Sequence, residues 1–467
     1  MSKKIIVNRR SVLKYGGAAS VALATPYFFT RGALAQSENY LNAPKGDTVT
    51  FGFNVPQTGP YADEGMDELD AYKLAVEHLN GEGDGGCLAT FTSKALKGNG
   101  VLGKKVAYVT GDTQTKSDAA RASAKSMIEK DGAVMITGGS SSGVAVAVQG
   151  LCQEAGVIFM AALTHSNDTT GKDKKANGFR HFFNAYMSGA ALAPVLEKAY
   201  GKDRRAYHLT ADYTWGWTQQ ASIQKFTEEI GWETVNNVLT PLAATDFSSY
   251  IAPVLNSGAD VLVLNHYGGN MVNSLTQAVQ FGLRDKQVNG KQFEIVVPLY
   301  SELMAKGAGE NIKGVYGSMN WNWTLEDEGT KAFVKSFGEK YGRPPSNAAQ
   351  TAYAQTLLYA DACERAGTFN PCAVVAALEG DGAAYPDVDS AANSGFLFDG
   401  LGNGQTLYRK ADHQCFKDVL VVKGKENPSN QYDTLEIVEK TPTKQVWYEP
   451  DNEMFAGGDL GTCNPGA

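Results

Sequence analysis

Apolar positions divide the chain after Thr48 into strand-like and helix-like segments. Alternation over Val49–Val55 predicts a first strand, because side chains on a strand repeat at every second position. Apolar residues at helical spacing over Leu69–Leu79 then predict a helix that ends at Asn80-Gly81. The glycine-rich stretch from Gly81 to Gly103 is typical of a surface insertion.

The same alternation then continues in two runs. In the first run, strands are expected at Val106–Val109, Val134–Thr137 and Val157–Ala161, with helices at Ser117–Lys130 and Ser142–Glu154. In the second run, strands are expected at Ala206–Thr210, Val235–Leu239, Val261–Leu264 and Ile295–Val297, with helices at Thr218–Ile230, Phe247–Asn256 and Met271–Phe281. Gly231, Gly258 and Gly282 stand just past the ends of those three helices, where glycine commonly terminates a helix.

Two such runs predict an α/β protein built from two doubly wound parallel-sheet lobes. Continuous β-branched strands suit parallel sheets that helices cover on both faces, and alternating strands and helices form βαβ units. The later segment differs: helices are expected at Glu326–Lys340 and Asn347–Ala366, and one long strand at Cys415–Val422. We interpret this segment as chain that recrosses the hinge to complete the first lobe.

The N-terminus predicts export. A basic start is followed by an apolar stretch from Tyr15 to Phe29, and Ala33-Leu34-Ala35 is a small-x-small cleavage site. These features predict a signal peptide over residues 1–35. The run Arg-Arg-Ser-Val-Leu-Lys at Arg9–Lys14 resembles the twin-arginine signal; the alternative is an ordinary secretory signal with a chance arginine pair.

Charge and length narrow the function further. Removal of residues 1–35 takes away six basic residues and no acidic ones, so the net charge falls from −8 to −14. An acidic protein argues against nucleic acid or an anionic membrane surface as partner. No later run approaches the ~18 apolar residues of a membrane-spanning helix. About 430 remaining residues exceed one ordinary core, in agreement with two lobes.

Six cysteines follow the expected cleavage site, and an even count in an oxidising compartment predicts disulfides. Cys363 and Cys372 flank a short Gly/Asn/Pro loop and are the first candidate pair. The remaining candidates are Cys87 with Cys152 and Cys415 with Cys463. The spacings lack a CxxC or Cys/His cluster, and the six histidines are scattered, so no metal site is expected.

The sequence lacks the motifs of several common enzyme classes. The sequence has no GxSxG, HExxH or Walker motif and no GxGxxG that opens a helix. We therefore expect neither an enzyme nor a cofactor, although an exported α/β enzyme remains one alternative.

Several motifs in chain order carry a family resemblance. They are Phe51–Ala62 with Leu74–Asn80, Gly138–Gly143, Gly156–Ser166, Asp212–Gly216 and Ala411–Gln414. The chain resembles the type I periplasmic solute-binding proteins of ABC transporters, in the Leu/Ile/Val and amide/urea-binding group. The resemblance implies two lobes joined by a three-crossover hinge that close on a ligand at the C-terminal edges of their strands.

The resemblance also implies the ligand-binding residues. Ser141 and Ser142 stand where a strand hands over to a helix; the alternative is simple N-capping. Thr164 and His165 follow the next strand, although a loop histidine is usually only solvated. The aromatic candidates from the second lobe are Tyr213, Trp215 and Tyr267, with ordinary interlobe packing as the alternative.

One stretch departs from the family pattern. Amino-acid binders of the family place an acid after the strand equivalent to Ile295–Val297, where it neutralises the ligand's ammonium. Leu299 or Tyr300 stands at that place here, and Glu302 could substitute only if the loop shifts. We therefore expect an amide, urea-like or carboxylate ligand in preference to an α-amino acid.

The expected function is capture of a small polar metabolite for the permease of an ABC importer by a periplasmic monomer. A ligand sensor that docks a receptor is the main alternative. The first lobe is expected to comprise residues 47–184 and 322–400, and the second 185–321 and 401–450, followed by a tail at 451–467.

Overall fold

The computed structural model describes residues 40–91, 93–380, 401–404, 406–455 and 457–466. The expected signal peptide, the arginine pair and the cleavage site lie outside these residues. Among the residues described, no helix combines the length and apolar character needed to cross a membrane.

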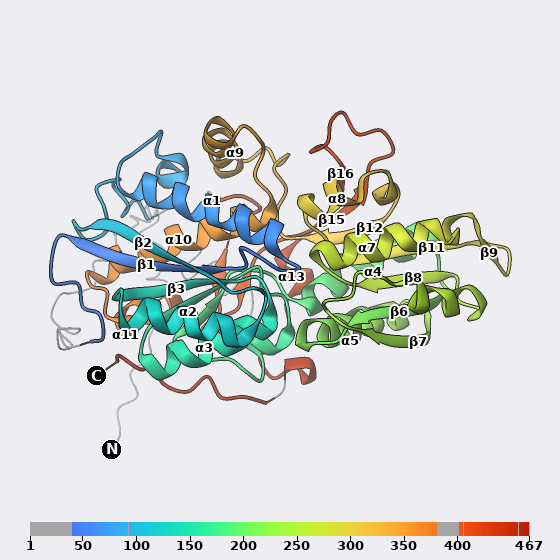
Figure 1. Ribbon diagram of the computed structural model, residues 1–467, viewed down its shortest axis with the longest axis horizontal. Coiled ribbons are helices and arrows are strands. Elements are labelled where there is room, and N and C mark those ends of the chain that lie inside the picture. Colours follow the sequence, from blue (N-terminus) through green and yellow to red (C-terminus); the bar gives the residue numbers. More distant parts are fainter. Residues whose placement is uncertain (1–39, 92, 381–400, 405, 456, 467) are drawn as a thin grey trace, which may run out of the picture. The chain divides into compact units, whose positions relative to one another are not determined.

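The first lobe is a parallel sheet with helices on both faces (Figure 1). Its strand order is β2-β1-β3-β4-β5. The strands are β1 (Thr48–Val55), β2 (Lys105–Asp112), β3 (Ala133–Gly139), β4 (Ile158–Ala162) and β5 (Gly178–Arg180). The helices are α1 (Ala62–Leu79), α2 (Ser117–Glu129), α3 (Ser142–Ala155), α9 (Glu328–Tyr341), α10 (Asn347–Ala366) and α11 (Pro371–Glu379). Helices α1 and α10 pack together over one core cluster, and α2 and α3 over another.

The second lobe has a mixed seven-stranded sheet in the order β16-β15-β12-β11-β8-β6-β7. Its parallel strands are β6 (Arg205–Ala211), β7 (Glu233–Thr240), β8 (Val261–Asn265), β11 (Glu294–Leu299) and β12 (Tyr316–Met319), and β15 (Val419–Gly424) and β16 (Leu435–Thr441) run antiparallel. Its helices are α4 (Ala185–Tyr200), α5 (Thr214–Glu229), α6 (Ser248–Ile251), α7 (Gly268–Gln280), α8 (Glu302–Ala308) and α13 (Thr443–Val446).

Short elements complete the described chain. The hairpins are β9 (Gln287–Val288) with β10 (Lys291–Gln292), and β13 (Leu407–Tyr408) with β14 (Cys415–Phe416). The 3-10 turns are η1 (Gly86–Ala89), η2 (Asn167–Thr170), η3 (Ala252–Asn256), η4 (Leu283–Asp285), η5 (Gly309–Ile312) and η6 (Glu453–Phe455).

The two-lobed α/β fold expected from the sequence is confirmed, and the chain passes between the sheets after β5, after β12 and before β15. The expected single strand Cys415–Val422 is wrong. It splits into β14, which pairs with β13, and β15, which joins the second sheet, because the chain changes lobes between them. The lobe limits stay a prediction, since residues 381–400 are outside the described chain and Leu401 and Tyr408 belong to the first lobe's core.

The expected disulfides are also wrong. The structure joins Cys372 to Cys463, and Cys87, Cys152, Cys363 and Cys415 are buried free thiols. Cys363 is fully buried in the core face of α10, whereas Cys372 lies half-buried at the start of α11. A short loop between the two residues therefore does not bring their side chains together.

The disulfide fixes the C-terminal tail to the first lobe. Asn464 exchanges hydrogen bonds with Asn177, and the Leu41 amide donates to the Gly466 carbonyl at 3.2 Å. The tail therefore makes a further passage back from the second lobe.

Candidate functional site

The C-terminal ends of strands from both lobes feed the helices that meet between the lobes. In the first lobe β1, β3 and β4 lead to α1, α3 and η2; in the second, β6, β8 and β11 lead to α5, α7 and α8. Hydrogen bonds connect the two sides: Tyr61 with Tyr213 at 2.7 Å between hydroxyls, and Ser166 with Thr214 at 3.0 Å. We call this region the interlobe site; Glu64, Glu68, Ser140–Ser142, Thr164–Ser166, Trp215, Gln219 and Tyr267 line it along with Tyr61 and Tyr213.

Two strand ends in the interlobe site hold strained backbone. Ser140 and Leu163 have φ angles of 43° and 37°, in the left-handed region that residues with side chains rarely adopt. Such a conformation costs about 1–3 kcal/mol and persists where packing over-determines it, frequently at ligand sites. Both residues are buried, so the surrounding packing holds these loops in place.

The predicted serine and threonine hydroxyls lie in the interlobe site but already have partners. Ser142 Oγ accepts the backbone N–H groups of His165 and Ser166 at 3.3 and 3.0 Å. Thr164 Oγ1 donates to the Ala162 carbonyl at 2.7 Å. Ser141 occupies the N-cap position of α3 without a capping bond from its side chain. Ser142 and Thr164 therefore shape the first-lobe loops, and Ser141 is buried beside them.

His165 presents a hydrogen-bond acceptor. Its Nδ1 lies 2.7 Å from the Phe183 carbonyl, an acceptor, so Nδ1 carries the proton. Nε2 is then an acceptor; it lies by Gln219 outside hydrogen-bonding geometry. Burial, with Arg180 nearby, lowers the pKa of His165 to about 3. The imidazole is therefore neutral at physiological pH.

Four aromatic rings form a closed cluster in the interlobe site. Ring centroids are 5.6 Å apart for Tyr61–Tyr267, 6.2 Å for Tyr267–Trp215 and 5.9 Å for Trp215–Tyr213, and the Tyr213 hydroxyl returns to Tyr61. The Trp215 Nε1 and the Tyr267 hydroxyl are buried without a hydrogen-bond partner. The structure thus brings Tyr213, Trp215 and Tyr267 together and adds Tyr61 from the first lobe.

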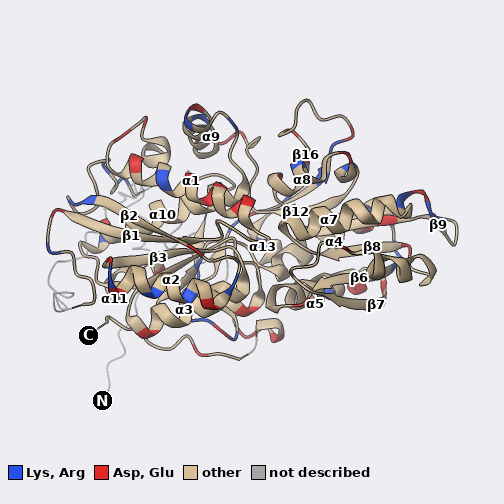
Figure 2. Ribbon diagram, viewed as in Figure 1, with Lys and Arg blue, Asp and Glu red and all other residues tan. Residues whose placement is uncertain are grey.

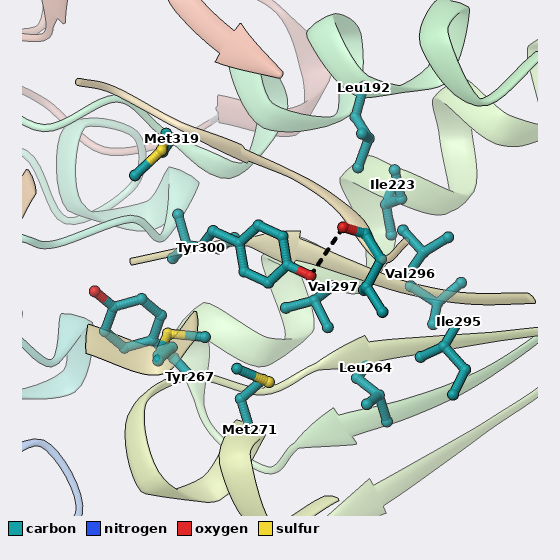
Figure 3. Packing of buried hydrophobic residues seen from close by; sticks show 14 of the residues in the cluster. Leu192, Ile223, Leu264, Tyr267, Met271, Ile295, Val296, Val297, Tyr300 and Met319 are labelled. Carbon is teal, nitrogen blue, oxygen red and sulfur yellow. Dashed lines mark hydrogen bonds between the residues drawn. The ribbon is translucent and has the colours of Figure 1, made fainter. Parts of the chain in front are cut away.

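Tyr300 and Leu299 lie elsewhere. Both are buried in the core of the second lobe, and the Tyr300 hydroxyl donates to the Val315 carbonyl at 3.2 Å (Figure 3). Glu302 lies at the start of α8, where one carboxylate oxygen accepts the backbone N–H of Asn347 at 2.9 Å. Burial raises the pKa of Glu302 to about 8. Leu299 and Tyr300 are therefore core residues, whereas Glu302 joins α8 to the start of α10 and keeps its other carboxylate oxygen, Oε1, buried without a hydrogen-bond partner.

Sequence reasoning missed two acids on α1. Glu64 and Glu68 are 2% and 0% exposed, one turn apart on the helix face toward the second lobe. Figure 2 shows acidic residues gathered in the first turns of α1. The apolar residues at helical spacing begin only at Leu69. Carried back one turn, the same periodicity places Glu68 and Glu64 on a buried face, which is the signal that could have revealed them.

The two acids differ in their partners. Ser301 of the second lobe donates to Glu64 at 3.2 Å, and Ser140 donates to one oxygen of Glu68. The other Glu68 oxygen, Oε1, has no hydrogen-bond partner. Burial raises the pKa of Glu64 to about 7 and that of Glu68 to about 8.

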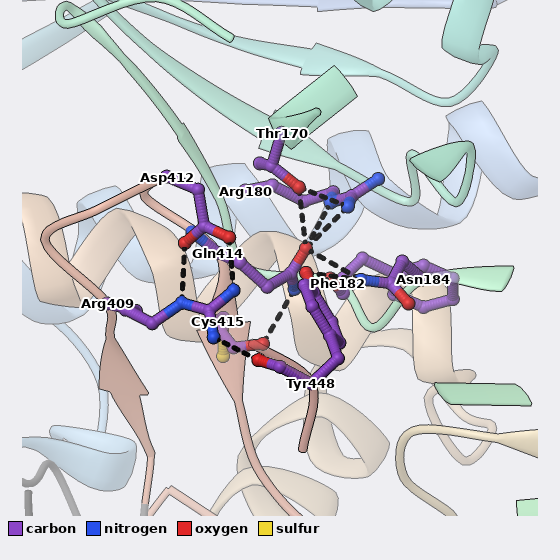
Figure 4. Close-up of polar contacts among 9 residues, drawn as sticks. All are labelled: Thr170, Arg180, Phe182, Asn184, Arg409, Asp412, Gln414, Cys415 and Tyr448. Atoms are coloured by element: carbon purple, nitrogen blue, oxygen red, sulfur yellow. Dashed lines mark hydrogen bonds and ion pairs between the residues drawn. The ribbon is translucent and has the colours of Figure 1, made fainter. Parts of the chain in front are cut away.

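A second buried polar cluster lies at the hinge and is densely bonded (Figure 4). Arg180, at the end of β5, donates to the Gln414 side chain at 2.8 Å and to the carbonyls of Thr164 and Ser166. Gln414 also donates to the Phe182 carbonyl at 2.9 Å. Arg409 pairs with Asp412 and stacks over the rings of Phe416 and Tyr448. We call these residues the hinge network.

Comparisons with known proteins agree with this geometry. The family model described as periplasmic binding protein matches residues 48–429. This chain belongs to the periplasmic binding protein family. No group of three or more His, Cys, Asp or Glu side chains among the described residues is placed to hold a metal ion.

Relatives of this periplasmic binding protein are distant but cover most of its length. The Leu/Ile/Val-binding protein homolog 7 of Brucella melitensis is 24% identical over 371 residues, which is 76% of this chain and 86% of the relative.

Two solved structures have the same fold. A periplasmic binding protein from Burkholderia mallei has a TM-score of 0.73 at 21% identity and covers 86% of this chain and 97% of its own. A solute-binding protein of an ABC transporter from Rhodopseudomonas palustris, in complex with 3,4-dihydroxybenzoic acid, has a TM-score of 0.70 at 19% identity and covers 85% of this chain and 98% of its own.

Proposed function

We propose that this chain is the periplasmic solute-binding component of an ABC importer and that it holds a small metabolite in the interlobe site. One observation carries the proposal. Buried polar atoms from both lobes converge there without a protein partner: Glu68 Oε1, His165 Nε2, Trp215 Nε1, the Gln219 amide and the Tyr267 hydroxyl. Buried polar groups are normally satisfied, so a cluster of exceptions needs an explanation, and a ligand provides one.

Both kinds of surface in the site suit a small ligand with a polar end and an apolar part. The four rings offer apolar area, and the remaining polar atoms fix orientation. A branched-chain amino acid, an amide, a urea-like molecule and a small carboxylate fit this description. Relatives named for leucine, isoleucine and valine, and a structural neighbour with a dihydroxybenzoic acid, span the same range.

The binding pose follows from the partners. Ser141, at the N-terminus of α3, and the loop at Thr164–His165 meet the polar end, because helix N-termini and loop N–H groups favour carboxylates and carbonyls. Trp215 and Tyr267 cover the apolar part. Tyr300 supports the second lobe as a core residue, and Glu302 joins α8 to the start of α10.

Export completes the proposal. Residues 1–35 act as a twin-arginine signal that is cleaved after Ala35, and the mature protein works in the periplasm as a monomer with the permease subunits of its importer. It carries out no reaction and needs no cofactor.

Solution scattering with thermal unfolding tests the proposal. A small-molecule extract of the source cells should raise the melting temperature and shrink the radius of gyration, since a ligand that binds only the folded state adds about 2.7 kcal/mol at one hundred times Kd. Mass spectrometry of the protein recovered from the extract should find a bound small molecule. Melting and scattering that stay unchanged would contradict the proposal. Loss of uptake on gene deletion would distinguish an importer from a sensor.

A further inference from the structure

The interlobe site contains buried acids but no basic side chain within it. Glu64 and Glu68 face the second lobe from α1, and the remaining lining residues are neutral at physiological pH. Arg180 lies one layer behind, where its guanidinium donates to the Ser166 carbonyl, to Thr170 and to Gln414. The charge that these acids can develop toward a ligand, when they ionise, is therefore negative.

The free polar atoms of the site are mixed: Trp215 Nε1 donates, the Gln219 amide and the Tyr267 hydroxyl can donate or accept, and the first lobe supplies the acceptors. His165 Nε2 can only accept a hydrogen bond. Glu68 Oε1 can also only accept when Glu68 is ionised, and both residues are buried. A buried carboxylate oxygen without a partner is costly, and an N–H donor that carries positive charge is its strongest partner. A ligand that brings such a donor would pair with Glu68.

The aromatic cluster points to the same chemistry. Four electron-rich rings, Tyr61, Tyr213, Trp215 and Tyr267, form a closed ring of contacts. Aromatic faces attract ammonium groups within about 6 Å, more strongly when the cation is shielded from water. Ser301, which donates to Glu64, also lies next to the Tyr267 hydroxyl, so the acids and the rings belong to one site.

We propose that Glu68, with Glu64 beside it, binds a protonated amine of the ligand, so that the counter-charge comes from α1 of the first lobe. This inference rests on the proposed function and revises the expected ligand. Leu299 and Tyr300, at the place where amino-acid binders of the family carry an acid, are core residues of the second lobe. The absence of an acid at Leu299 and Tyr300 therefore does not exclude an amine-bearing ligand, because in this proposal Glu68 of α1 supplies the counter-charge.

The raised pKa values of both acids agree with this role. Burial holds Glu68 largely protonated near neutral pH without a cation, so it folds without a buried bare charge. Arrival of an ammonium favours the ionised form, and the carboxyl releases its proton to solvent as the ion pair forms. Glu64 and Asp67 are the other acids whose charge acts on Glu68, and Glu302 acts, like Glu68, on the Tyr267 hydroxyl.

Matched probes test the proposal by calorimetry and thermal unfolding. Isopentylamine, isocaproate and leucine share one branched chain and carry the amine, the carboxylate or both; benzylamine and benzoate form a second pair. The amine-bearing probes should bind at least about tenfold more tightly than the matched carboxylates, the size expected for a charge-assisted pair. Amines that bind no better than carboxylates, or not at all, would overturn the proposal.

Two variants identify the residue. Glu68→Gln keeps the shape and neutrality of the protonated acid, so it should fold, and it should reduce amine affinity about tenfold or more while leaving carboxylate probes unaffected. Asp63→Asn removes an acid from an exposed position of the same helix and should change neither. Amine binding that is indifferent to Glu68→Gln would also overturn the proposal. Compaction with the cell extract, but not with amines, would contradict this inference and leave the proposed function standing; no response to either contradicts both.

Discussion

The interlobe site and the hinge network are equally buried but differ in how their polar groups are satisfied. In the hinge network, Arg180 and Gln414 bond to each other and to backbone carbonyls on both sides of the crossover. In the interlobe site, Glu68, His165 and Tyr267 each keep a buried polar atom without a partner. The polar groups of the hinge network have protein partners and maintain architecture, whereas those of the interlobe site are the groups for which we propose a ligand as partner. The contrast is measurable: substitutions in the hinge network should mainly lower stability, whereas substitutions in the interlobe site should mainly weaken ligand binding.

The largest loss of stability is expected from Gln414→Leu. The substitution removes one acceptor of the buried Arg180 guanidinium and also the bond that Gln414 donates to the Phe182 carbonyl, which together should lower the free energy of unfolding by about 3–5 kcal/mol. Urea unfolding followed by circular dichroism measures the change. Gln224→Leu, on the outer face of α5, is the control and should stay within about 0.5 kcal/mol. Equal losses of unfolding free energy in the two variants would show that Gln414 contributes no more to stability than an ordinary residue outside the hinge network.

A smaller loss should follow when the tail that extends from the hinge is released. Cys463→Ser removes the disulfide to Cys372, which links two residues 91 positions apart in the sequence. Its loss should lower the free energy of unfolding by about 2–5 kcal/mol. Peptide mapping of periplasmic material under denaturing conditions should find Cys372 linked to Cys463 and Cys363 labelled by an alkylating probe. A peptide that links Cys363 to Cys372 would contradict the observed pairing.

The next effect depends on pH and belongs to the interlobe site. The folded-state pKa of Glu68 is raised to about 8 from an ordinary 4.5, so the folded protein binds more protons than the unfolded chain between these values. Stability should therefore fall as pH rises from about 5 to 8, by on the order of 1–3 kcal/mol from this group. Glu68→Gln should reduce the fall of stability between about pH 5 and pH 8, and Asp63→Asn should not. Melting curves at several pH values check this; an unchanged slope in Glu68→Gln would assign the pH effect elsewhere.

The smallest stability effect comes from a matched pair of hydroxyl deletions. The Tyr448 hydroxyl accepts from Asn184 at 2.9 Å, so Tyr448→Phe should cost about 1 kcal/mol. The Tyr267 hydroxyl has no hydrogen-bond partner, so Tyr267→Phe should change stability by less than about 0.5 kcal/mol but weaken binding of an accepted probe. Thermal unfolding and calorimetry on both variants measure the two quantities. A greater stability loss for Tyr267→Phe would reverse the comparison.

The order of strands and helices was predictable because local periodicity and glycine stops specify it. Gly231, Gly258 and Gly282 all have positive φ where the sequence placed helix ends. The disulfide was not predictable, since Cys372 meets a tail distant in sequence and proximity along the chain misled the pairing.

The candidate site was predictable in part. Strand ends gave Ser142, Thr164, Trp215 and Tyr267 their place between the lobes, because the ends of parallel strands share one edge. Tyr300 also follows a strand, but its ring turns into the core, which local sequence does not encode. Glu64 and Glu68 were not predicted, because acids at a helix start are usually solvated, whereas here they are buried beside Ser301 of the second lobe and Ser140 of the first.

The tail's return to the first lobe has a consequence for rearrangement of the chain. Leu41 and Gly466 are joined by a backbone hydrogen bond, so the two ends of the described fold are neighbours on one lobe. A short glycine-serine linker could close this gap, and new termini could be opened at the Asn289–Gly290 hairpin tip of the opposite lobe. Such a circular permutant would keep the interlobe site intact. A fluorescent reporter could then be attached at the new termini in the second lobe. Motion of the second lobe relative to the first would change its fluorescence.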